Sequence, residues 1–295
     1  MRINDTFAVE RKTEQRNYKV KFIIASEGSK SEPKYFEGIS SNIISDNIKI
    51  YNLLRDYVNS NNSHPTHVVK LINDFMCNNV VESITVNELI NKLLNWNHEN
   101  SNKLDVNKLI DYLKNKYSLN EKIDYNILEK IILDLFKSEI YIDLAKNFKD
   151  YVISQNLTYD EKIDKLNIVI DRDEKSFLDY QYDEVVNFCN KNNINLYVSN
   201  PNFEFWLLLH FKEVENISKE ELFQNKKIST KRNFLEKKLN DICGYNKNRF
   251  SFDYFQPYIK DAIKREKLYE ESIIGLKNNL GTNVGKLVNE IISAK

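Results

Sequence analysis

The chain alternates short apolar segments with helical patterns, and this alternation limits the folds it can adopt more than any other feature. The apolar segments run over Lys19 to Ala25, Ile48 to Leu54, Leu166 to Ile170 and Ile194 to Val198. Two of them, VKFIIA and LNIVI, are almost continuously apolar, which is typical of central strands covered by helices on both faces. The pattern predicts an α/β fold with a mostly parallel sheet flanked by helices.

A helical pattern follows each predicted strand. The patterns come after Pro33 in KYFEGI, after Pro65 in THVVKLINDF, after Asp173 in FLDYQYDEVVNFC and after Pro201 in NFEFWLLLHF. In three of the four, a proline stands near the first turn, where its missing N–H removes no helical hydrogen bond. The order of strand and helix is therefore the one that connects parallel strands.

Two regions lack the strand signal. Between about Met76 and Asp164, helical patterns follow one another in VNELINKLLNW, VNKLIDYLKNKY and ILEKIILDLFK, which predicts a helical insertion between the second and third strands. Beyond Glu215 the pattern is helical again, with the spacing of a capping box at Ser218 and Glu221. Further helices are expected over 229–242, 256–279 and 283–293.

The pattern divides the chain into five parts. These are an N-terminal tail (1–17), a first part of the core (18–75), a helical insertion (76–164), a second part of the core (165–215) and a helical C-terminal region (216–295).

Composition excludes some classes of protein. With 295 residues and 41% hydrophobic content the chain can bury a substantial core, and its formal charge of +0 provides no overall field to attract a polyanion. The three cysteines are far apart and form no CxxC pair, which favours reduced thiols in a cytosolic protein. No segment has the apolar length of a membrane span or a signal peptide, so we expect a cytoplasmic protein with no membrane contact.

Acidic residues follow three of the predicted strands. Glu27 and Glu32 follow the first strand, Asp171 and Asp173 follow the third, and Glu204 lies in the first helical turn after the fourth. Because ligands of open parallel sheets bind at the carboxyl ends of the strands, these positions are informative about function.

The pair Asp171 and Asp173 predicts a cation site. In extended geometry residues two apart point to the same side, and two carboxylates held together repel unless a cation neutralises them. Oxygen ligands without a His or Cys cluster favour Mg²⁺ or Mn²⁺ over zinc. The alternative is that Asp173 caps the following helix. Gly28, beside Glu27, would let the backbone turn sharply and approach a ligand, or it belongs to an ordinary βα turn.

These residues also carry a family resemblance. A strand ending in Glu-Gly and a later strand ending in Asp-x-Asp resemble the Toprim domain of topoisomerases, primases and overcoming-lysogenization-defect nucleases. The blocks EGSKSEPKYF, VIDRDE and NPNFEFWLLLHF resemble the RloB family, Toprim-related proteins linked to abortive infection and restriction loci. The segments YNK (245–247) and GTNVGKLV (281–288) are similar to weaker family blocks. The resemblance covers 18–75 and 165–295, and the insertion is instead expected to be particular to an AbiL-like branch of antiphage effectors.

The resemblance implies a Toprim-like core and a metal-dependent phosphodiester nuclease. Glu27 would act as general acid/base or ligand, and Asp171 and Asp173 would hold one or two Mg²⁺ or Mn²⁺ ions. Glu32 would complete a second metal site, and Glu204 would either reach a metal or stabilise its helix dipole.

Phosphodiester hydrolysis also benefits from a cation near the scissile phosphate. Lys247 is the candidate, with Arg172 and Lys30 as further phosphate contacts beside Gly28. In the segment NPNFEFWLLLHF, by contrast, apolar residues recur at helical spacing. That stripe predicts core, and His210 within it is expected to be a hydrogen-bonded structural histidine.

The resulting hypothesis is a nuclease effector of antiphage abortive infection. The chain has no GxxxxGK[ST] loop, so a separately encoded ATPase is the expected partner. DNA and RNA, including tRNA, both remain open as substrates, as does a homo-oligomer. The alternative from another class is a Toprim-like scaffold that binds nucleic acid or an ATPase without catalysis.

Overall fold

The computed structural model describes most of the chain outside the N-terminal tail and part of the insertion. The described residues are 20–28, 30–44, 48–53, 65–77, 83–99, 106–124, 160, 162–173, 177–230 and 232–294.

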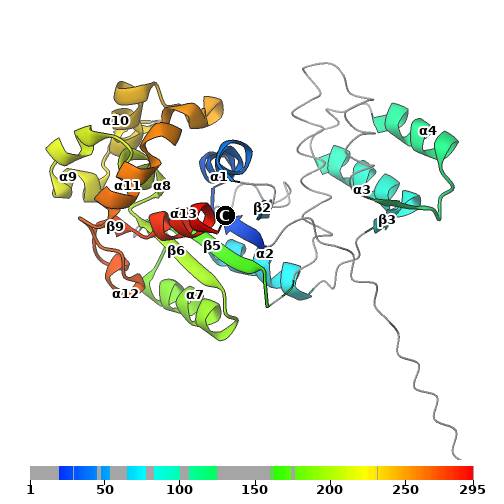
Figure 1. Cartoon of the computed structure of the whole chain (residues 1–295), viewed down its shortest axis with the longest axis horizontal. Helices are drawn as coiled ribbons and strands as arrows, with labels where there is room; N and C mark the ends of the chain where they lie inside the picture. Colours follow the sequence, from blue (N-terminus) through cyan, green and yellow to red (C-terminus); the bar gives the residue numbers. More distant parts are fainter. Residues whose placement is uncertain are drawn as a thin grey trace, which may run out of the picture.

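A five-stranded sheet in the order β2-β1-β5-β6-β9 forms the centre of the molecule (Figure 1). Its strands are β1 (Val20–Ser26), β2 (Ile48–Leu53), β5 (Lys165–Asp171), β6 (Asn195–Asn200) and β9 (Gly281–Thr282). The first four are mutually parallel, and β9 is antiparallel to β6. The α/β fold and all four predicted strands are confirmed. The fifth strand was not predicted, because a two-residue strand has no periodicity to detect.

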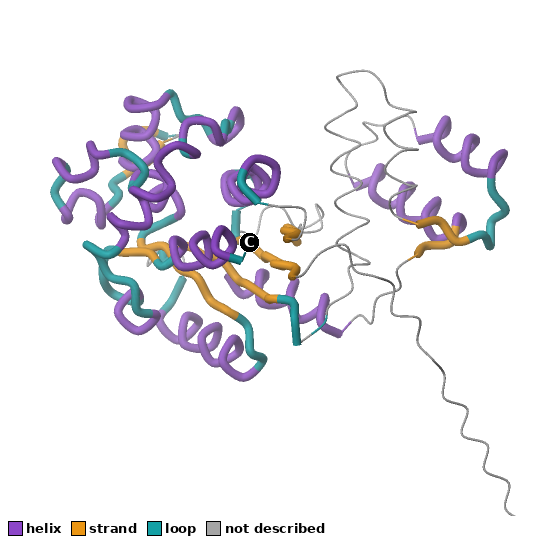
Figure 2. Tube along the Cα trace, in the orientation of Figure 1, coloured by secondary structure: helices purple, strands orange, loops and turns teal. Residues whose placement is uncertain are grey.

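Helices cover both faces of this sheet (Figures 1 and 2). Helices α1 (Ser31–Asn42), α8 (Phe203–Leu208) and α13 (Val284–Ser293) pack on one face, and α2 (Pro65–Cys77), α7 (Asp179–Lys191) and α12 (Ile273–Leu276) pack on the other. In β1, Phe22 and Ile24 join the first group while Ile23 and Ala25 join the second. Successive strand residues point to opposite faces, so burial on both sides requires the continuous apolar run seen in the sequence.

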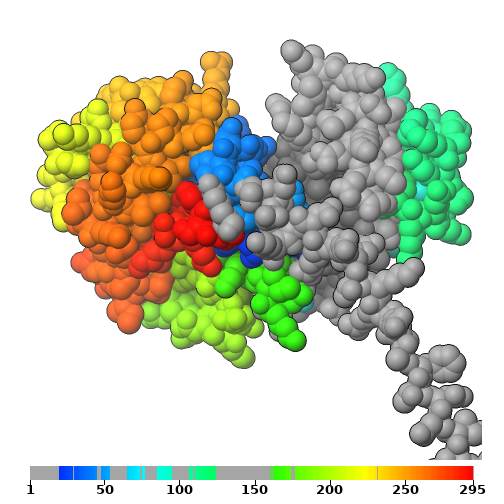
Figure 3. Space-filling model, viewed as in Figure 1, coloured from blue at the N-terminus to red at the C-terminus, as the bar shows by residue number. Residues whose placement is uncertain are grey.

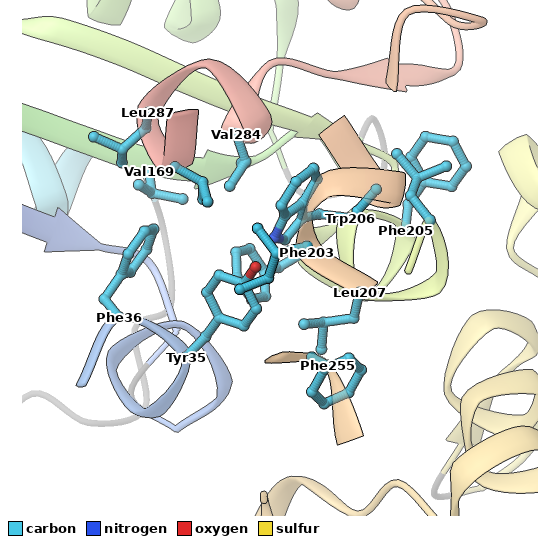
Figure 4. Close-up of a cluster of buried hydrophobic side chains, with 14 of the residues drawn as sticks. Tyr35, Phe36, Val169, Phe203, Phe205, Trp206, Leu207, Phe255, Val284 and Leu287 are labelled. Carbon is cyan, nitrogen blue, oxygen red and sulfur yellow. The ribbon is translucent and has the colours of Figure 1, made fainter. Parts of the chain in front are cut away.

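Helix α8 lies entirely in the core. All six of its residues are buried, and Tyr35 of α1 packs edge-on against Phe203 and Trp206 (Figure 4). The predicted core stripe is therefore confirmed, but the helix is shorter than expected and begins at Phe203 after Asn202. Asn200 does not cap this helix, because its side chain donates a hydrogen bond to the Leu276 carbonyl at 2.8 Å. The Asn200–Pro201 peptide is cis, and Pro201 lies before the helix, which begins at Phe203.

His210 is a buried structural histidine, as the sequence predicted. Its Nε2 accepts a hydrogen bond from the Tyr35 hydroxyl at 3.0 Å, and its Nδ1 lies 3.1 Å from the Leu207 carbonyl, which can only accept. Nδ1 therefore carries the proton of a neutral ring. Burial lowers the pKa of His210 from 6.5 to about 3.

We expect His210 to make the fold sensitive to acid. Its folded pKa is depressed, so stability is lost as the pH falls below the unfolded value, by about 1.4 kcal/mol per pH unit. Relative to His210→Gln, which cannot titrate, the wild type should lose about 2 kcal/mol between pH 7 and pH 5. Urea unfolding of both proteins at the two pH values measures this. An equal change in both proteins would contradict the assignment.

The insertion is helical only in part. Helices α3 (Val86–Glu99) and α4 (Val106–Lys116) confirm two predicted helices, and the third, over 127–137, lies outside the described residues. The expectation of helices alone is wrong, because β3 (Ser83–Thr85) pairs with β4 (Lys122–Asp124) in an antiparallel hairpin. These strands are three residues long, too short for a period-two pattern to stand out. Helix α4 lies at the opposite end of the molecule from α9 (Figures 1 and 3).

The C-terminal region is mostly but not wholly helical. Its elements are η2 (Lys212–Asn216), α9 (Lys219–Gln224), β7 (Lys227–Ser229), β8 (Arg232–Asn233), α10 (Phe234–Cys243), η3 (Lys247–Arg249), η4 (Phe252–Tyr254), η5 (Gln256–Tyr258), α11 (Ile259–Glu266), and then α12, β9 and α13. The Ser218 hydroxyl accepts from the Glu221 amide at 3.2 Å, as the capping spacing predicted.

The single helix predicted over 256–279 is interrupted. The Glu270 carboxylate accepts hydrogen bonds from the amides of Glu271 and Ser272, which turns the backbone between α11 and α12. Glu270 also forms a backbone bridge to Gly281 at the start of β9. Pairing with the sheet edge therefore overrides the local helical pattern. Among the described helices, none combines the length and the apolar content needed to cross a membrane.

Candidate functional site

The carboxyl ends of β1 and β5 lie side by side and bring Glu27 and Asp171 together. The ladder between the strands continues one step past β1, because the Glu27 amide donates to the Val169 carbonyl at 3.0 Å. The Glu27 carboxylate then turns across to β5, where its Oε2 accepts from the Asp171 amide at 3.1 Å. Parallel pairing of β1 with β5 thus brings the Glu27 carboxylate to the end of β5.

Asp171 links this pair to α8. Its Oδ1 accepts from the Phe203 amide at 2.8 Å, so the last residue of β5 caps the first residue of the helix that carries Glu204. Burial raises the pKa of Asp171 well above its usual value, and the carboxylates of Glu27, Glu32 and Glu204 raise it further. Charges from three strand–helix junctions therefore act on one carboxyl group.

Glu32 enters the same region from the first turn of α1. It is buried, and its Oε1 accepts from the Gly28 amide at 2.9 Å. A Cβ at Gly28 would lie 2.0 Å from Glu32 Oε2, so the glycine permits this close approach. Burial raises the pKa of Glu32, and the Glu204 carboxylate raises it further. Gly28 therefore accommodates a carboxylate of the protein itself.

Glu204 holds the cation of the site. Its Oε1 accepts from the Tyr245 hydroxyl at 2.9 Å and lies 3.0 Å from Lys247 Nζ. Lys247 also pairs with Glu236 Oε1 at 2.7 Å, while its side chain remains 45% exposed. Burial lowers the pKa of Lys247, but the Glu204 and Glu236 carboxylates outweigh this and raise it above its usual value. The ammonium is therefore permanently charged and is reachable from solvent.

Two contributors to the site, Tyr245 and Glu236, are not predicted from the sequence. Tyr245 is buried, and its hydroxyl lies 2.7 Å from Ser31 Oγ as well as beside Glu204, so one phenol joins the first turns of α1 and α8. The segment YNK carries the sequence signal at this position, and it indicates Lys247 rather than Tyr245. Glu236 sits on an amphipathic helix with an ordinary charge pattern, which carries no sequence signal for this role.

Arg172 and Asp173 follow Asp171, the last residue of β5. Strand β5 ends at Asp171, the Arg172 amide donates to the Ser199 carbonyl at 2.8 Å, and the Asp173 carbonyl accepts from the Phe177 amide at 2.9 Å, so a turn begins at Asp173. Asp173 is exposed, whereas Asp171 is partly buried, and the role of Asp173 as a metal ligand stays a prediction. The alternative that Asp173 caps α7 is wrong, because Leu178 occupies that position.

Arg172 has a structural role that replaces its predicted phosphate contact. It is 1% exposed and donates to the carbonyls of Lys277 and Phe177, and it pairs with Asp179 at 2.6 Å. A guanidinium buried in this way cannot reach a phosphate outside. Lys30, in contrast, is exposed and donates to Asn248 Oδ1 at 2.5 Å, next to Lys247.

The residues present fit a hard divalent cation. Glu27, Glu32, Asp171 and Glu204 each have one oxygen oriented by a protein donor, as carboxylate ligands usually do. The buried amide oxygen of Asn202, beside Phe203, has no hydrogen-bond partner among the described residues.

Among all residues that the structure describes, no three Asp, Glu, His or Cys side chains lie close enough to share one ion. Mg²⁺ commonly takes one or two carboxylates and completes its shell with water and phosphate oxygens. The cluster suits that mode better than an all-protein cage.

Fold and site together define an α/β protein with a carboxylate cluster and one lysine at the carboxyl edge of its mostly parallel sheet. The sequence model described as RloB-like protein matches residues 22–291, so the chain belongs to the RloB-like family, as its sequence blocks predicted. No curated protein and no solved structure matches the chain.

Proposed function

We propose that the chain is a Toprim-type, Mg²⁺- or Mn²⁺-dependent phosphodiester nuclease. It would act in the cytoplasm as an effector of antiphage abortive infection, together with a separately encoded ATPase. The observation that carries the proposal is the convergence of Glu27, Glu32 and Glu204 around the Asp171 carboxyl, with Lys247 at their edge. Proteins retain such repulsive clusters mainly at functional sites.

The side chains of the cluster have separable tasks in this proposal. When bound, a divalent cation would offset charge on the non-bridging oxygens and lower the pKa of an attacking water. Glu27 and Asp171 would hold it, and Glu32 would support a second ion. Lys247 would contact the scissile phosphate, since it is charged and partly exposed. Glu204 would orient that ammonium through the 3.0 Å contact and would not itself need to reach a metal.

Cleavage assays test the proposal directly. Purified protein is incubated with supercoiled plasmid and with total RNA, in Mg²⁺, in Mn²⁺ and in EDTA, with and without any ATPase encoded beside it. We expect cleavage of at least one substrate that EDTA abolishes. The substrate that is cut decides between the DNA and RNA alternatives. No cleavage in any combination would contradict the nuclease proposal.

One observation favours the alternative of a non-catalytic scaffold. No three potential ligands lie within reach of a single ion in the described part of the chain. A scaffold would bind nucleic acid or an ATPase without consuming substrate, and Mg²⁺ titration by calorimetry would then release no heat of binding. Metal binding by the wild type that Glu27→Gln weakens would instead support the nuclease.

Tyr245→Phe is expected to lower the cleavage rate by about 10-fold, with little change in KM. A hydrogen bond to a charged group is worth about 1.5–3 kcal/mol, and its loss would release Glu204 and with it Lys247. The matched control is Tyr254→Phe, because Tyr254 is exposed. Rates are measured well below both melting temperatures. Equal rates for the two variants would show that the Tyr245 hydroxyl does not position the site.

A further inference from the structure

Three cations near the carboxylate cluster have no acidic partner in the part of the chain that the structure describes. Lys30, Lys34 and Arg249 are exposed, and no carboxylate of the described residues lies within ion-pair distance of any of them. Lys247, a neighbour of the same group, pairs with two carboxylates. An unpaired surface cation retains its full capacity to bind an anion.

The fold places these cations on two segments that meet beside the site. Lys30 directly precedes α1, and Lys34 lies one helical turn further on, where its amide donates to the Lys30 carbonyl. Lys30 Nζ reaches Asn248 Oδ1 across a sequence separation of 218 residues. The contact lies directly next to two contacts of the site itself, those of Ser31 with Tyr245 and of Lys247 with Glu204.

The turn that carries Arg249 is held in place locally. The Asn246 side chain accepts from the Asn248 amide at 2.9 Å, and the Asn246 carbonyl accepts from the Arg249 amide at 2.9 Å. Within this turn Lys247 contacts the acids while Arg249 remains exposed. The turn therefore places Lys247 against the carboxylates and leaves Arg249 exposed beside them.

We propose that Lys30, Lys34 and Arg249 form a cationic rim that binds the sugar-phosphate backbone of a nucleic acid beside the carboxylate cluster. This inference rests on the proposed function, because it assumes a polyanionic substrate at that cluster. The chain has a formal charge of +0, and the cluster combines Glu27, Glu32, Asp171, Glu204 and Glu236 with one lysine. Such a centre repels a polyanion, so cations next to it must supply the attraction.

Recognition through this rim would be independent of base sequence. Lysine and arginine contacts to phosphates position a nucleic acid without reading it, and each contact releases condensed counterions. The binding constant should therefore fall steeply with salt, and removal of each contact should lower the slope of log K against log[salt] by about 0.7–0.9.

The test compares two triple variants in a Glu27→Gln background, which prevents cleavage during the measurement. The rim variant is Lys30→Ala/Lys34→Ala/Arg249→Ala. The control, Lys212→Ala/Lys227→Ala/Lys260→Ala, removes three exposed lysines that likewise have no acidic partner among the described residues. Fluorescence anisotropy with labelled random-sequence DNA and RNA oligonucleotides is recorded from 50 to 200 mM KCl in Mg²⁺.

We expect the rim variant to lower the salt slope by about 2–3 and to weaken binding to all sequences alike, while the control keeps the parental slope. An unchanged slope in the rim variant, or an equal fall in the control, would overturn the inference. If the inference is overturned in this way but the wild type cleaves nucleic acid, the nuclease proposal is retained and only the proposed rim is rejected. If the salt slope of the rim variant falls as expected but the wild type cleaves nothing, the rim is supported as a nucleic-acid-binding surface and the nuclease proposal is rejected.

Discussion

Asp171→Asn is expected to lower divalent-dependent phosphodiester cleavage by about 10³-fold, and Glu27→Gln by a similar factor. Asp171 is the carboxyl on which the other acids converge, and its Oδ1 also fixes the start of α8. The amide keeps an oxygen for the Phe203 N–H but cannot supply a negative charge. The initial rate of cleavage on the best substrate, in Mg²⁺ and in Mn²⁺, measures the effect.

Asp173→Asn provides the matched control for that prediction. Asp173 is the other half of the Asp-x-Asp pair, yet it is exposed and lies beyond the end of β5. Its variant should retain activity within about threefold of wild type, since an exposed charge contributes little in water. Equal loss in the two variants would show that Asp173 is recruited during the reaction.

Unfolding cannot explain the loss expected for Asp171→Asn. Burial and the neighbouring carboxylates raise the pKa of Asp171, so the structure favours the uncharged form that asparagine resembles. A raised folded pKa means that the charge costs stability as the pH rises past the unfolded value. At pH 8 the variant should therefore unfold at the same or a higher urea concentration than the wild type. A lower midpoint would leave the activity loss open to a folding explanation.

Asp164→Ala is expected to cost about 3–5 kcal/mol of unfolding free energy. Asp164 and Lys21 form an ion pair of 3.7 Å with side chains 0% and 1% exposed, where the insertion returns to β5. The carboxylate also accepts from the Lys21 amide at 3.1 Å and from the Asp160 amide at 2.9 Å. Its removal would leave a buried ammonium without this counter-ion. Urea unfolding at pH 7 measures the loss.

Two further variants test whether the cost expected for Asp164→Ala comes from the burial of the ion pair. Asp241→Ala removes the partner of Lys237 in a pair that is about half exposed, and it should cost no more than about 0.5 kcal/mol. Lys21→Met combined with Asp164→Leu should recover part of the stability, because an apolar pair needs no counter-charge but leaves the Lys21 and Asp160 amides without this acceptor. A cost below about 1 kcal/mol for Asp164→Ala would show that water reaches the Lys21 ammonium.

Much of the fold could be read from local pattern. The apolar runs at β1 and β5 and the alternation with helices predicted the parallel sheet, since burial on both faces leaves a continuous record in the sequence. The short strands β3, β4 and β9 escaped prediction, because two or three residues carry no period. The break between α11 and α12 escaped it too, since pairing of Glu270 with Gly281 depends on distant residues.

By itself, the sequence determined the family, the sheet, and the strand ends at which acids gather. A residue directly after a strand lies at the end of that strand, so the position of Glu27 and Asp171 at one edge of the sheet follows from local pattern alone.

Only the tertiary structure decided the partners of these acids. Tyr245 and Lys247 meet Glu204 from more than 30 positions away, and Glu236 pairs with the same Lys247, through the packing of α8 against α10. Asp171 and Asp173 are two residues apart, yet Asp171 ends β5 and is partly buried, while Asp173 is exposed at the start of a turn. Contacts across the chain arise from packing, which no local spacing records.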